Sequence, residues 1–321
     1  MLALLAWTTS LVVTAADLGP PFTVELSGGP LAPGQPGVVL VRPQRPLASL
    51  SAGLFGRQVE LVPWANGRYL GLVGVGLDDP VGRAPLTLSY ALEAGEVMQV
   101  ELDVDVVDRA YPSNTLRVAR RFVRPGPAAR RQIRRERREL AELWREPSRE
   151  RLWRGNFILP RQSELTSVFG VRRIFNGRLR SRHKGIDLDG SGGEPVAAAN
   201  RGRVLFAGSR YYSGRTVILD HGLGLYTLYF HLRSVEVAAG QLVERGTVIG
   251  KLGSTGRVTG PHLHFAVRLS GIYVDPVTFL QLELAADPLA STAATRPASG
   301  PVSAPASAPA SALEATAAQR L

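Results

Sequence analysis

Residues 262–269 read HLHFAVRL, a short apolar and aromatic run that begins with two closely spaced histidines. Similar runs precede it and are separated by Gly-rich turns: VLFAG at 204–208, TVILDHG at 216–222 and LYTLYFHL at 225–232. Short runs rich in Val, Leu, Tyr and Thr are typical of β-strands. No long helical stripe occurs between residues 156 and 282. We therefore predict a compact antiparallel β domain over residues 156–286.

A second β region is predicted upstream, over residues 17–112. Six strand-like runs alternate with turn residues there: FTVEL, GVVLVRP, QVELVPW, RYLGLVGVG, LTLSYAL and MQVELDVDVV. Strands of this number and spacing are typical of an immunoglobulin-like β-sandwich. The region contains no histidine and no clustered acid–base set, so we interpret it as an accessory domain. The predicted fold class is therefore mainly β, with a helix connecting the two domains.

Residues 113–155 are predicted to form an Arg-rich helical linker. Ile133, Leu140, Leu143 and Trp144 form one apolar stripe of a helix over 126–147, which Pro147 ends. Between Arg117 and Arg154 there are fourteen arginines and five glutamates. Two interpretations stay open: a solvated face of a connecting helix, or an electrostatic tether to anionic cell-envelope polymers or a membrane surface.

Composition excludes several classes of protein. The chain of 321 residues has no cysteine, so a disulfide scaffold, a Cys-ligated zinc finger and a thiol nucleophile are excluded. Its formal charge of +11 raises the question of nucleic acid. However, the arginine-rich segment accompanies no nucleic-acid fold motif and is not interleaved with aromatic residues. We expect no nucleic-acid partner.

The two ends of the chain differ from the rest in composition. Residues 1–16 are apolar, end in small residues and are too short to span a bilayer, which predicts a secretory signal peptide. Residues 287–321 are rich in Ala, Pro and Ser, which predicts a disordered tail. No other segment approaches membrane-spanning length. We therefore expect an exported protein.

The five histidines all lie between positions 183 and 264. His183 and Asp187 stand in HKGID, and His262 and His264 stand in HLH, where strand geometry would place both imidazoles on one face. A catalytic zinc ion needs three nitrogen or oxygen ligands and an open position for water. These two motifs together supply enough ligands for such a site.

Several stretches resemble the M23 (lysostaphin/LytM-type) zinc metallopeptidases, enzymes that cut peptide cross-links in peptidoglycan. The resemblance covers about 120 residues in order: SVFGVRR at 167–173, HKGIDL at 183–188, PVAAANRGRVLFAG at 195–208, TVILDHGLGLYTLYFHL at 216–232, GQLVERGTVIGKLGSTGRVTGPHLHFAVR at 240–268 and DPVTFL at 275–280. One departure is Phe230, which replaces a small residue before His231 and could line the groove.

The resemblance implies a role for each histidine. It makes His183, Asp187 and His264 the ligands of one Zn²⁺ per chain, and His231 and His262 the catalytic residues. His221 corresponds to a structural position. The implied reaction is hydrolysis of peptidoglycan peptide bonds by metal-activated water. The resemblance also implies a bacterial protein, located in the periplasm, at the cell envelope or outside the cell. Which of His231 and His262 acts as the general base stays open.

An alternative function belongs to a different class. Some members of this family have lost their ligands and act as non-enzymatic LytM-type activators or binding modules for cell-wall amidases. All five family positions are filled in this chain, which favours the enzyme. The bond that is cut and the role of the sandwich domain, targeting or autoinhibition, stay open.

Overall fold

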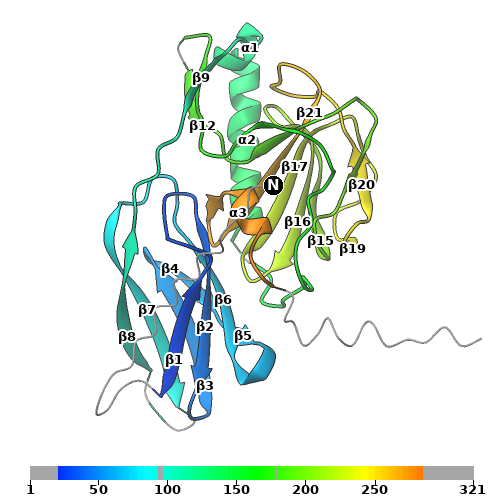
Figure 1. Ribbon diagram of the computed structural model, residues 1–321. Coiled ribbons are helices and arrows are strands. Elements are labelled where there is room, and N and C mark those ends of the chain that lie inside the picture. The colour runs from blue at the N-terminus through cyan, green and yellow to red at the C-terminus, as the bar shows by residue number, and fades with distance from the viewer. Residues whose placement is uncertain (1–20, 93–94, 96, 146, 178, 285–321) are drawn as a thin grey trace, which may run out of the picture.

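The computed structural model describes residues 21–92, 95, 97–145, 147–177 and 179–284 (Figure 1). The predicted signal peptide at 1–16 and the predicted tail at 287–321 lie outside the described residues. Within the described part of the chain, no helix is long and apolar enough to cross a membrane.

The N-terminal domain consists of two four-stranded antiparallel sheets. The first has the strand order β1 (Phe22–Ser27), β2 (Pro36–Pro43), β6 (Tyr69–Gly74) and β5 (Val62–Pro63). The second has the order β4 (Arg57–Glu60), β3 (Leu47–Leu54), β7 (Gly82–Leu92) and β8 (Met98–Val106). Alternate residues of β7, Ala84, Leu86, Leu88 and Tyr90, are buried between the sheets. A short 3₁₀ helix, η1 (Ala65–Gly67), follows β5.

This strand order confirms the predicted immunoglobulin-like sandwich. The eight strands β1 to β8 can be lettered A, B, C, C′, D, E, F and G along the chain. The first sheet is then A-B-E-D and the second is C′-C-F-G, the arrangement of immunoglobulin domains. Sequence analysis takes the run QVELVPW as one strand, whereas it forms β4 and β5 in different sheets, and it misses β3 altogether. Its sequence LASLSAGL is built mostly of small and polar residues, and only its second half is continuously buried. It therefore lacks the bulky β-branched residues by which strands are recognised.

The C-terminal domain is built around an eight-stranded antiparallel sheet. Its order is β10 (Leu165–Ser167), β13 (Ile186–Asp189), β21 (His262–Leu269), β17 (Leu225–Leu232), β16 (Gly214–Gly222), β15 (Gly202–Arg210) and β19 (Leu242–Val243), with β22 (Ile272–Val274) paired to β21. A three-stranded sheet of β14 (Pro195–Ala197), β20 (Val248–Lys251) and β18 (Ser234–Val235) flanks it, and α3 (Pro276–Leu280) follows β22. The predicted β domain is confirmed.

Alternation along β21 separates core from site. Leu263, Phe265 and Val267 are fully buried in the main hydrophobic core. His262, His264 and Ala266 occupy the alternate positions and so lie on the opposite face of the sheet. The prediction that both imidazoles share one face is therefore confirmed.

The linker is only partly helical. Helices α1 (Arg120–Val123) and α2 (Pro127–Leu143) lie within it, and α2 starts one residue after the predicted start and ends before Pro147. Residues Ser113–Leu116 instead form β9, which pairs in parallel with β11 (Arg172–Phe175) and, through it, with β12 (Leu179–Arg182). Segment 113–116 thus adds a strand to the C-terminal domain, an arrangement that depends on a partner over fifty residues away.

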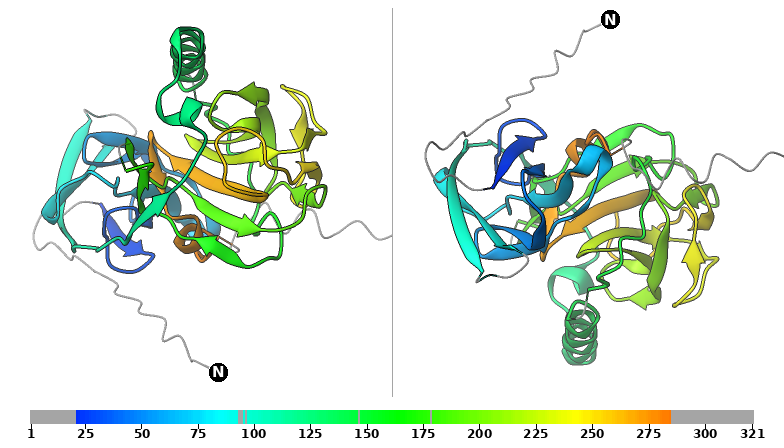
Figure 2. Two further views of the ribbon diagram at one scale, coloured as in Figure 1. Left: turned by 90° about the horizontal axis from the view of Figure 1, so that it is seen from above. Right: turned by 90° about the horizontal axis from the view of Figure 1, so that it is seen from below.

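The apolar stripe of α2 packs on the face of the large sheet that carries the site histidines. Ile133 is buried, and the Trp144 ring meets the Tyr226 ring edge-on with 4.6 Å between centroids. Glu136 accepts hydrogen bonds from the backbone nitrogen of Tyr211 at 3.0 and 3.1 Å. Both views of Figure 2 place α2 at the margin of the molecule, beside the C-terminal domain.

The sandwich has a core of its own, and its outer face also contributes residues to the core of the C-terminal domain. Val38, Leu70 and Leu72 point out of the sandwich and join the core cluster of the C-terminal domain. Polar contacts reinforce this interface: Arg109 forms a 2.8 Å ion pair with buried Asp275, whose backbone nitrogen donates to the Gly34 carbonyl at 2.7 Å. The sandwich and the C-terminal domain therefore lie side by side in a defined orientation (Figures 1 and 2).

Candidate metal centre and active site

Three buried side chains bring nitrogen and oxygen donors to one point. His183 Nε2 lies 3.0 Å from Asp187 Oδ1 and 2.9 Å from His264 Nδ1, and His264 Nδ1 lies 2.9 Å from Asp187 Oδ1. These are the three residues predicted as ligands, and they form a group that could hold a metal ion. Two imidazole nitrogens and a carboxylate oxygen are the donors that a catalytic zinc site uses. The donor set therefore fits zinc.

Strand register produces this convergence. Asp187 on β13 lies directly opposite His264 on β21. His183 lies just before β13, and its backbone nitrogen donates to the Val171 carbonyl at 2.8 Å. Gly185 allows the close approach, because a Cβ at this position would lie 2.4 Å from the Phe265 carbonyl oxygen and 2.8 Å from His264 Nε2.

Hydrogen bonds behind the donors orient them. His183 Nδ1 donates to the Val168 carbonyl at 2.7 Å, which leaves the lone pair of Nε2 directed at the other donors. Arg173 Nη2 donates to Asp187 Oδ2 and, at 2.9 Å, to Ser167 Oγ. Asp187 is thereby held with Oδ1 toward the two imidazoles.

The protonation states suit metal binding. Burial raises the pKa of Asp187, but its close polar contacts with His183 and His264 outweigh this effect, and the pKa lies well below its ordinary value. Burial lowers the pKa of His264 to about 4. At neutral pH the carboxyl is ionised and the imidazole neutral, as metal ligands must be.

The other two predicted site histidines flank this cluster. His231 Nδ1 donates to the Thr255 carbonyl at 2.8 Å, and its backbone has a positive φ of 65°. His262 Nδ1 donates to the Gly260 carbonyl at 2.9 Å, and its Nε2 lies 3.8 Å from Asp187 Oδ1. The two rings are 5.0 Å apart between centroids. Burial, followed by the charges of His264 and His262, lowers the pKa of His231 to about 3, so this imidazole is neutral.

Phe230 contacts the cluster through the His264 ring. Its ring stacks on the His264 imidazole with 5.1 Å between centroids and 13° between planes. The residue also lines a cavity beside the site, together with His183, His231 and His264. The expectation that Phe230 could line the groove is thus met by its position.

His221 lies away from this cluster. It is fully buried, its Nδ1 donates to the Arg201 carbonyl at 2.8 Å, and its Nε2 lies 2.7 Å from Thr227 Oγ1. Both ring nitrogens are therefore engaged within the fold. This environment agrees with its interpretation as a structural residue.

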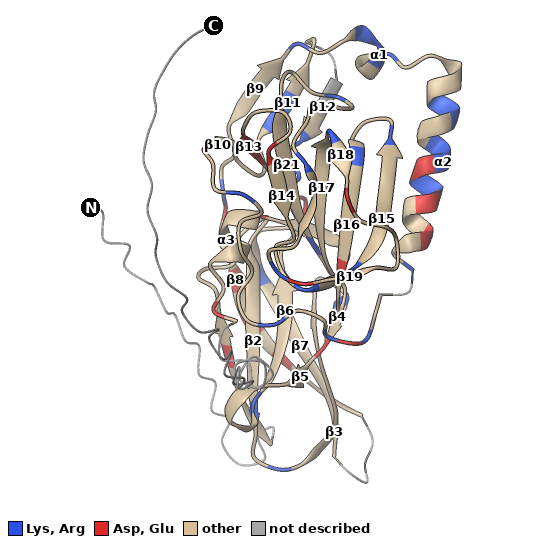
Figure 3. Ribbon diagram, turned by 90° about the vertical axis from the view of Figure 1, so that its right-hand side faces the viewer, with Lys and Arg blue, Asp and Glu red and all other residues tan. Residues whose placement is uncertain are grey.

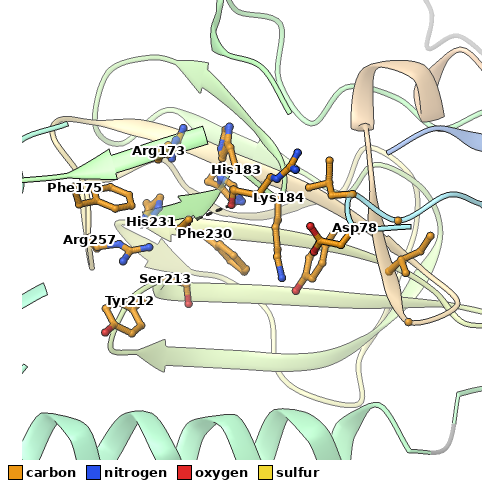
Figure 4. Close-up of a pocket in the computed structure, with 18 of the residues that line it drawn as sticks. Asp78, Arg173, Phe175, His183, Lys184, Tyr212, Ser213, Phe230, His231 and Arg257 are labelled. Atoms are coloured by element: carbon orange, nitrogen blue, oxygen red, sulfur yellow. Dashed lines mark hydrogen bonds between the residues drawn. The ribbon is translucent and has the colours of Figure 1, made fainter. Parts of the chain in front are cut away.

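Two arginines near the site were not predicted as site residues. Arg173 supports Asp187, and Arg257 lies beside the Phe175 and Tyr212 rings (Figure 4). No local signal identifies Arg173, because its partner lies fourteen positions away across a turn. Arg257 stands in the Gly-rich stretch GSTGRVTG before HLH, and its position there is the only available signal.

The donor triad and the two flanking imidazoles on an antiparallel sheet form a centre that could hold a metal ion. Residues 181–276 match the model of Peptidase family M23, so the chain contains an M23 peptidase domain.

Known proteins similar to this chain agree with that assignment. The DD-carboxypeptidase/endopeptidase Mpg of Neisseria meningitidis is 41% identical over 119 residues, which cover 36% of this chain and 27% of that protein. The peptidoglycan DD-endopeptidase ShyC of Vibrio cholerae is 37% identical over 116 residues, covering 36% of this chain and 27% of that protein. The matched region therefore spans about a quarter of the length of these curated relatives.

A solved structure extends the likeness beyond the M23 region. The crystal structure of a putative peptidase M23 from Pseudomonas aeruginosa is 29% identical and superposes with a TM-score of 0.61. The superposition covers 78% of this chain and 95% of that one. This share exceeds the C-terminal domain, so the likeness includes part of the N-terminal region.

Proposed function

We propose that this protein is an exported zinc metalloendopeptidase that hydrolyses peptide bonds in peptidoglycan cross-links or stem peptides. The observation that carries the proposal is the meeting of three buried donor atoms with two flanking imidazoles in an M23 domain. One curated relative is named a DD-carboxypeptidase/endopeptidase and the other a peptidoglycan DD-endopeptidase, and these names support the substrate class.

His183, Asp187 and His264 would hold the zinc ion. When bound, zinc acts as a Lewis acid that lowers the pKa of water and polarises a carbonyl. Arg173 and the Val168 carbonyl keep Asp187 and His183 aimed at the metal position. Such supporting contacts typically change metal affinity by about 10–100-fold.

His231 and His262 would move protons during hydrolysis. Each directs its Nδ1 atom to a backbone carbonyl, of Thr255 and Gly260 respectively, so the Nε2 atom of each ring is the one left to exchange a proton. One ring would take the proton of the attacking water and the other would stabilise the oxyanion or protonate the leaving amine. The two rings lie 5.0 Å apart beside the donor triad, which suits both assignments.

The test pairs zinc stoichiometry with cleavage of isolated sacculi. The purified protein is expected to hold one zinc per chain and to release new peptide ends that a chelator prevents. His183→Ala and Asp187→Ala should lose zinc and activity together. His231→Ala should keep zinc while turnover falls by about 10²–10⁴-fold.

Three results would contradict parts of this proposal. Loss of zinc in His231→Ala would refute the division between ligands and catalytic residues. A zinc-loaded wild-type protein that leaves sacculi intact would refute peptidoglycan as the substrate. A zinc-free protein that stimulates a cell-wall amidase would favour the activator function.

We also propose that α2 binds anionic cell-envelope polymers. Its apolar stripe faces the sheet, so its arginines face outward: Arg130, Arg131, Arg134, Arg135, Arg137 and Arg138 are all exposed. Figure 3 shows basic residues spaced along the ribbon of α2, with a few acidic residues among them. Two glutamates form surface ion pairs, Arg135 with Glu139 at 3.4 Å and Arg145 with Glu142 at 3.0 Å, so most arginines keep an uncompensated charge.

Retention of the protein on sacculi tests this second proposal. Replacing the exposed arginines of α2 by glutamine should weaken retention and flatten its dependence on salt. Cleavage of a small soluble cross-linked muropeptide should be unaffected, because α2 lies away from the donor triad. Equal retention of variant and wild type would refute the tether. Fractionation of cells that express the full chain tests export.

A further inference from the structure

The donor triad lies between two cavities that share three lining residues. The larger cavity, of about 690 Å³, contains His183, His231 and His264. The smaller one, of about 250 Å³, contains Asp187 and His262. Three residues line both: Arg173, Phe175 and Arg257. A peptide that passes over the triad from one cavity to the other would therefore meet these side chains.

Arg257 is held in place by two aromatic rings. Its guanidinium carbon lies 4.4 Å from the centroid of the Phe175 ring and 4.7 Å from that of Tyr212. Its backbone nitrogen donates to the Tyr212 carbonyl at 2.8 Å. Aromatic contacts engage the planar face of a guanidinium and leave its N–H edge available. Figure 4 shows Arg257 between Phe175 and Tyr212, next to His231.

Arg257 differs from Arg173 in having no acceptor. Arg173 is paired with Asp187, whereas no carboxylate or carbonyl within the described residues accepts a side-chain hydrogen bond from Arg257. None of its side-chain nitrogens is among the fully buried unpaired atoms of the described residues, and Arg257 lines both cavities. Arg257 is thus a positioned, charged, forked donor without a partner, beside the donor triad.

The other charges of the two cavities do not compensate it. Asp187 and Asp79 are bound by Arg173 and Arg57. Asp78 and Asp189 are exposed and lie outside ion-pair distance of Arg257. Asp78 lies at the opposite end of the larger cavity from Arg257, beyond His183 and Lys184 (Figure 4). The end of the groove near Arg257 is therefore cationic.

We propose that Arg257 binds a carboxylate of the substrate peptide close to the scissile bond. The inference rests on the proposed peptidase function and narrows its substrate class to peptides that carry a free carboxylate there. A planar guanidinium matches a carboxylate with two parallel hydrogen bonds, and a neutral carboxamide cannot replace that charge. Hydrogen bonds to a charged group correspond to a preference of about 10–100-fold for the carboxylate peptide.

The probe is a cross-linked muropeptide dimer and the same dimer after amidation of its carboxylates with carbodiimide and ammonia. Two quantities are measured for zinc-loaded full-length protein in a buffer without chelator. One is kcat/KM for cleavage of each dimer, and the other is Kd for each dimer. We expect wild-type protein to prefer the carboxylate dimer by about 10–100-fold. Arg257→Gln should lose that preference while its zinc content and thermal stability match the wild type.

Two further variants separate a specific contact from general charge. Arg257→Lys keeps the charge but loses the fork and the aromatic stacking, so it should recover only a small part of the preference. Lys184→Gln removes another cation that lines the larger cavity, and its preference ratio should stay within about threefold of the wild-type ratio, as for an exposed charge. If Lys184→Gln lowers the preference ratio as much as Arg257→Gln does, the preference comes from the general positive charge of the cavity and the proposal is overturned.

The two levels of proposal fail in different ways. Wild-type protein that cleaves both dimers equally well overturns the role of Arg257 and leaves the peptidase intact. Wild-type protein that cleaves neither dimer overturns the peptidase, and Kd values that differ between the two dimers then still support the carboxylate site, whereas equal Kd values overturn it. Should Arg257→Gln fail to fold, the wild-type ratio and Arg257→Lys decide the question alone.

Discussion

Replacing Gly185 by alanine tests whether close strand packing holds the donor triad. The added Cβ would lie 2.4 Å from the Phe265 carbonyl oxygen, where ordinary contacts begin at 3.4 Å. It would also lie 2.8 Å from Cε1 and Nε2 of His264. The backbone must therefore move by about 1 Å to relieve the contact. Phe265 is fully buried, so β21 cannot move away without disturbing the core.

That displacement is large compared with what a metal site tolerates. Ligand distances in a working site hold within about 0.2 Å, and a misplacement of about 1 Å near reacting groups can lower the rate by about 10²-fold. We therefore expect Gly185→Ala to bind zinc more weakly and to lose about 10²-fold in kcat/KM. Overpacking of this kind also destabilises a fold by about 1–3 kcal/mol.

The assay compares Gly185→Ala with a matched glycine variant. Gly192 is exposed, and nothing lies within 4 Å of a Cβ built on it, so Gly192→Ala should behave as the wild type. Zinc affinity is measured by competition with a chromophoric chelator, activity on sacculi, and stability by urea unfolding. If Gly185→Ala binds zinc and cleaves as well as Gly192→Ala does, the argument from close packing is refuted.

Three more predictions concern the contacts around the site and the core. Arg173→Gln removes the hydrogen bond to Asp187 Oδ2 and should weaken zinc binding by about 10–100-fold in chelator competition. Arg172 is an exposed neighbour, and Arg172→Gln should leave zinc binding unchanged. Burial lowers the pKa of His221 from 6.5 to about 4, so in that window the unfolded chain binds a proton that the folded chain does not. Stability should therefore rise with pH from about 4 to 6.5, and His221→Gln should flatten that slope in urea unfolding at a series of pH values. Because the sandwich contributes to the core of the C-terminal domain, calorimetry should show one unfolding transition, and two well-separated transitions would contradict a shared core.

Much of the site follows from local sequence. Alternation in HLHFAVRL puts His262 and His264 on one face, and the structure confirms it because strand side chains alternate whatever the strand's partner is. HKGID supplies a histidine and a carboxylate four residues apart, and its resemblance to a known motif connects it to HLH. The predicted sandwich is likewise confirmed, since its strands are bounded by clear turn residues.

The contacts that complete the site come from tertiary structure. Arg173 reaches Asp187, and Phe175 and Tyr212 enclose Arg257, because strands distant in sequence meet at one edge of the groove. Segment 113–116 becomes strand β9 only because β11 offers it a free edge. In the same way, Val38 and Leu72 have the apolar character of sandwich residues, and only the packing of the two domains shows that they face outward into a second core. Local periodicity reports which face of a strand is apolar, whereas the identity of the surface that covers that face depends on long-range packing.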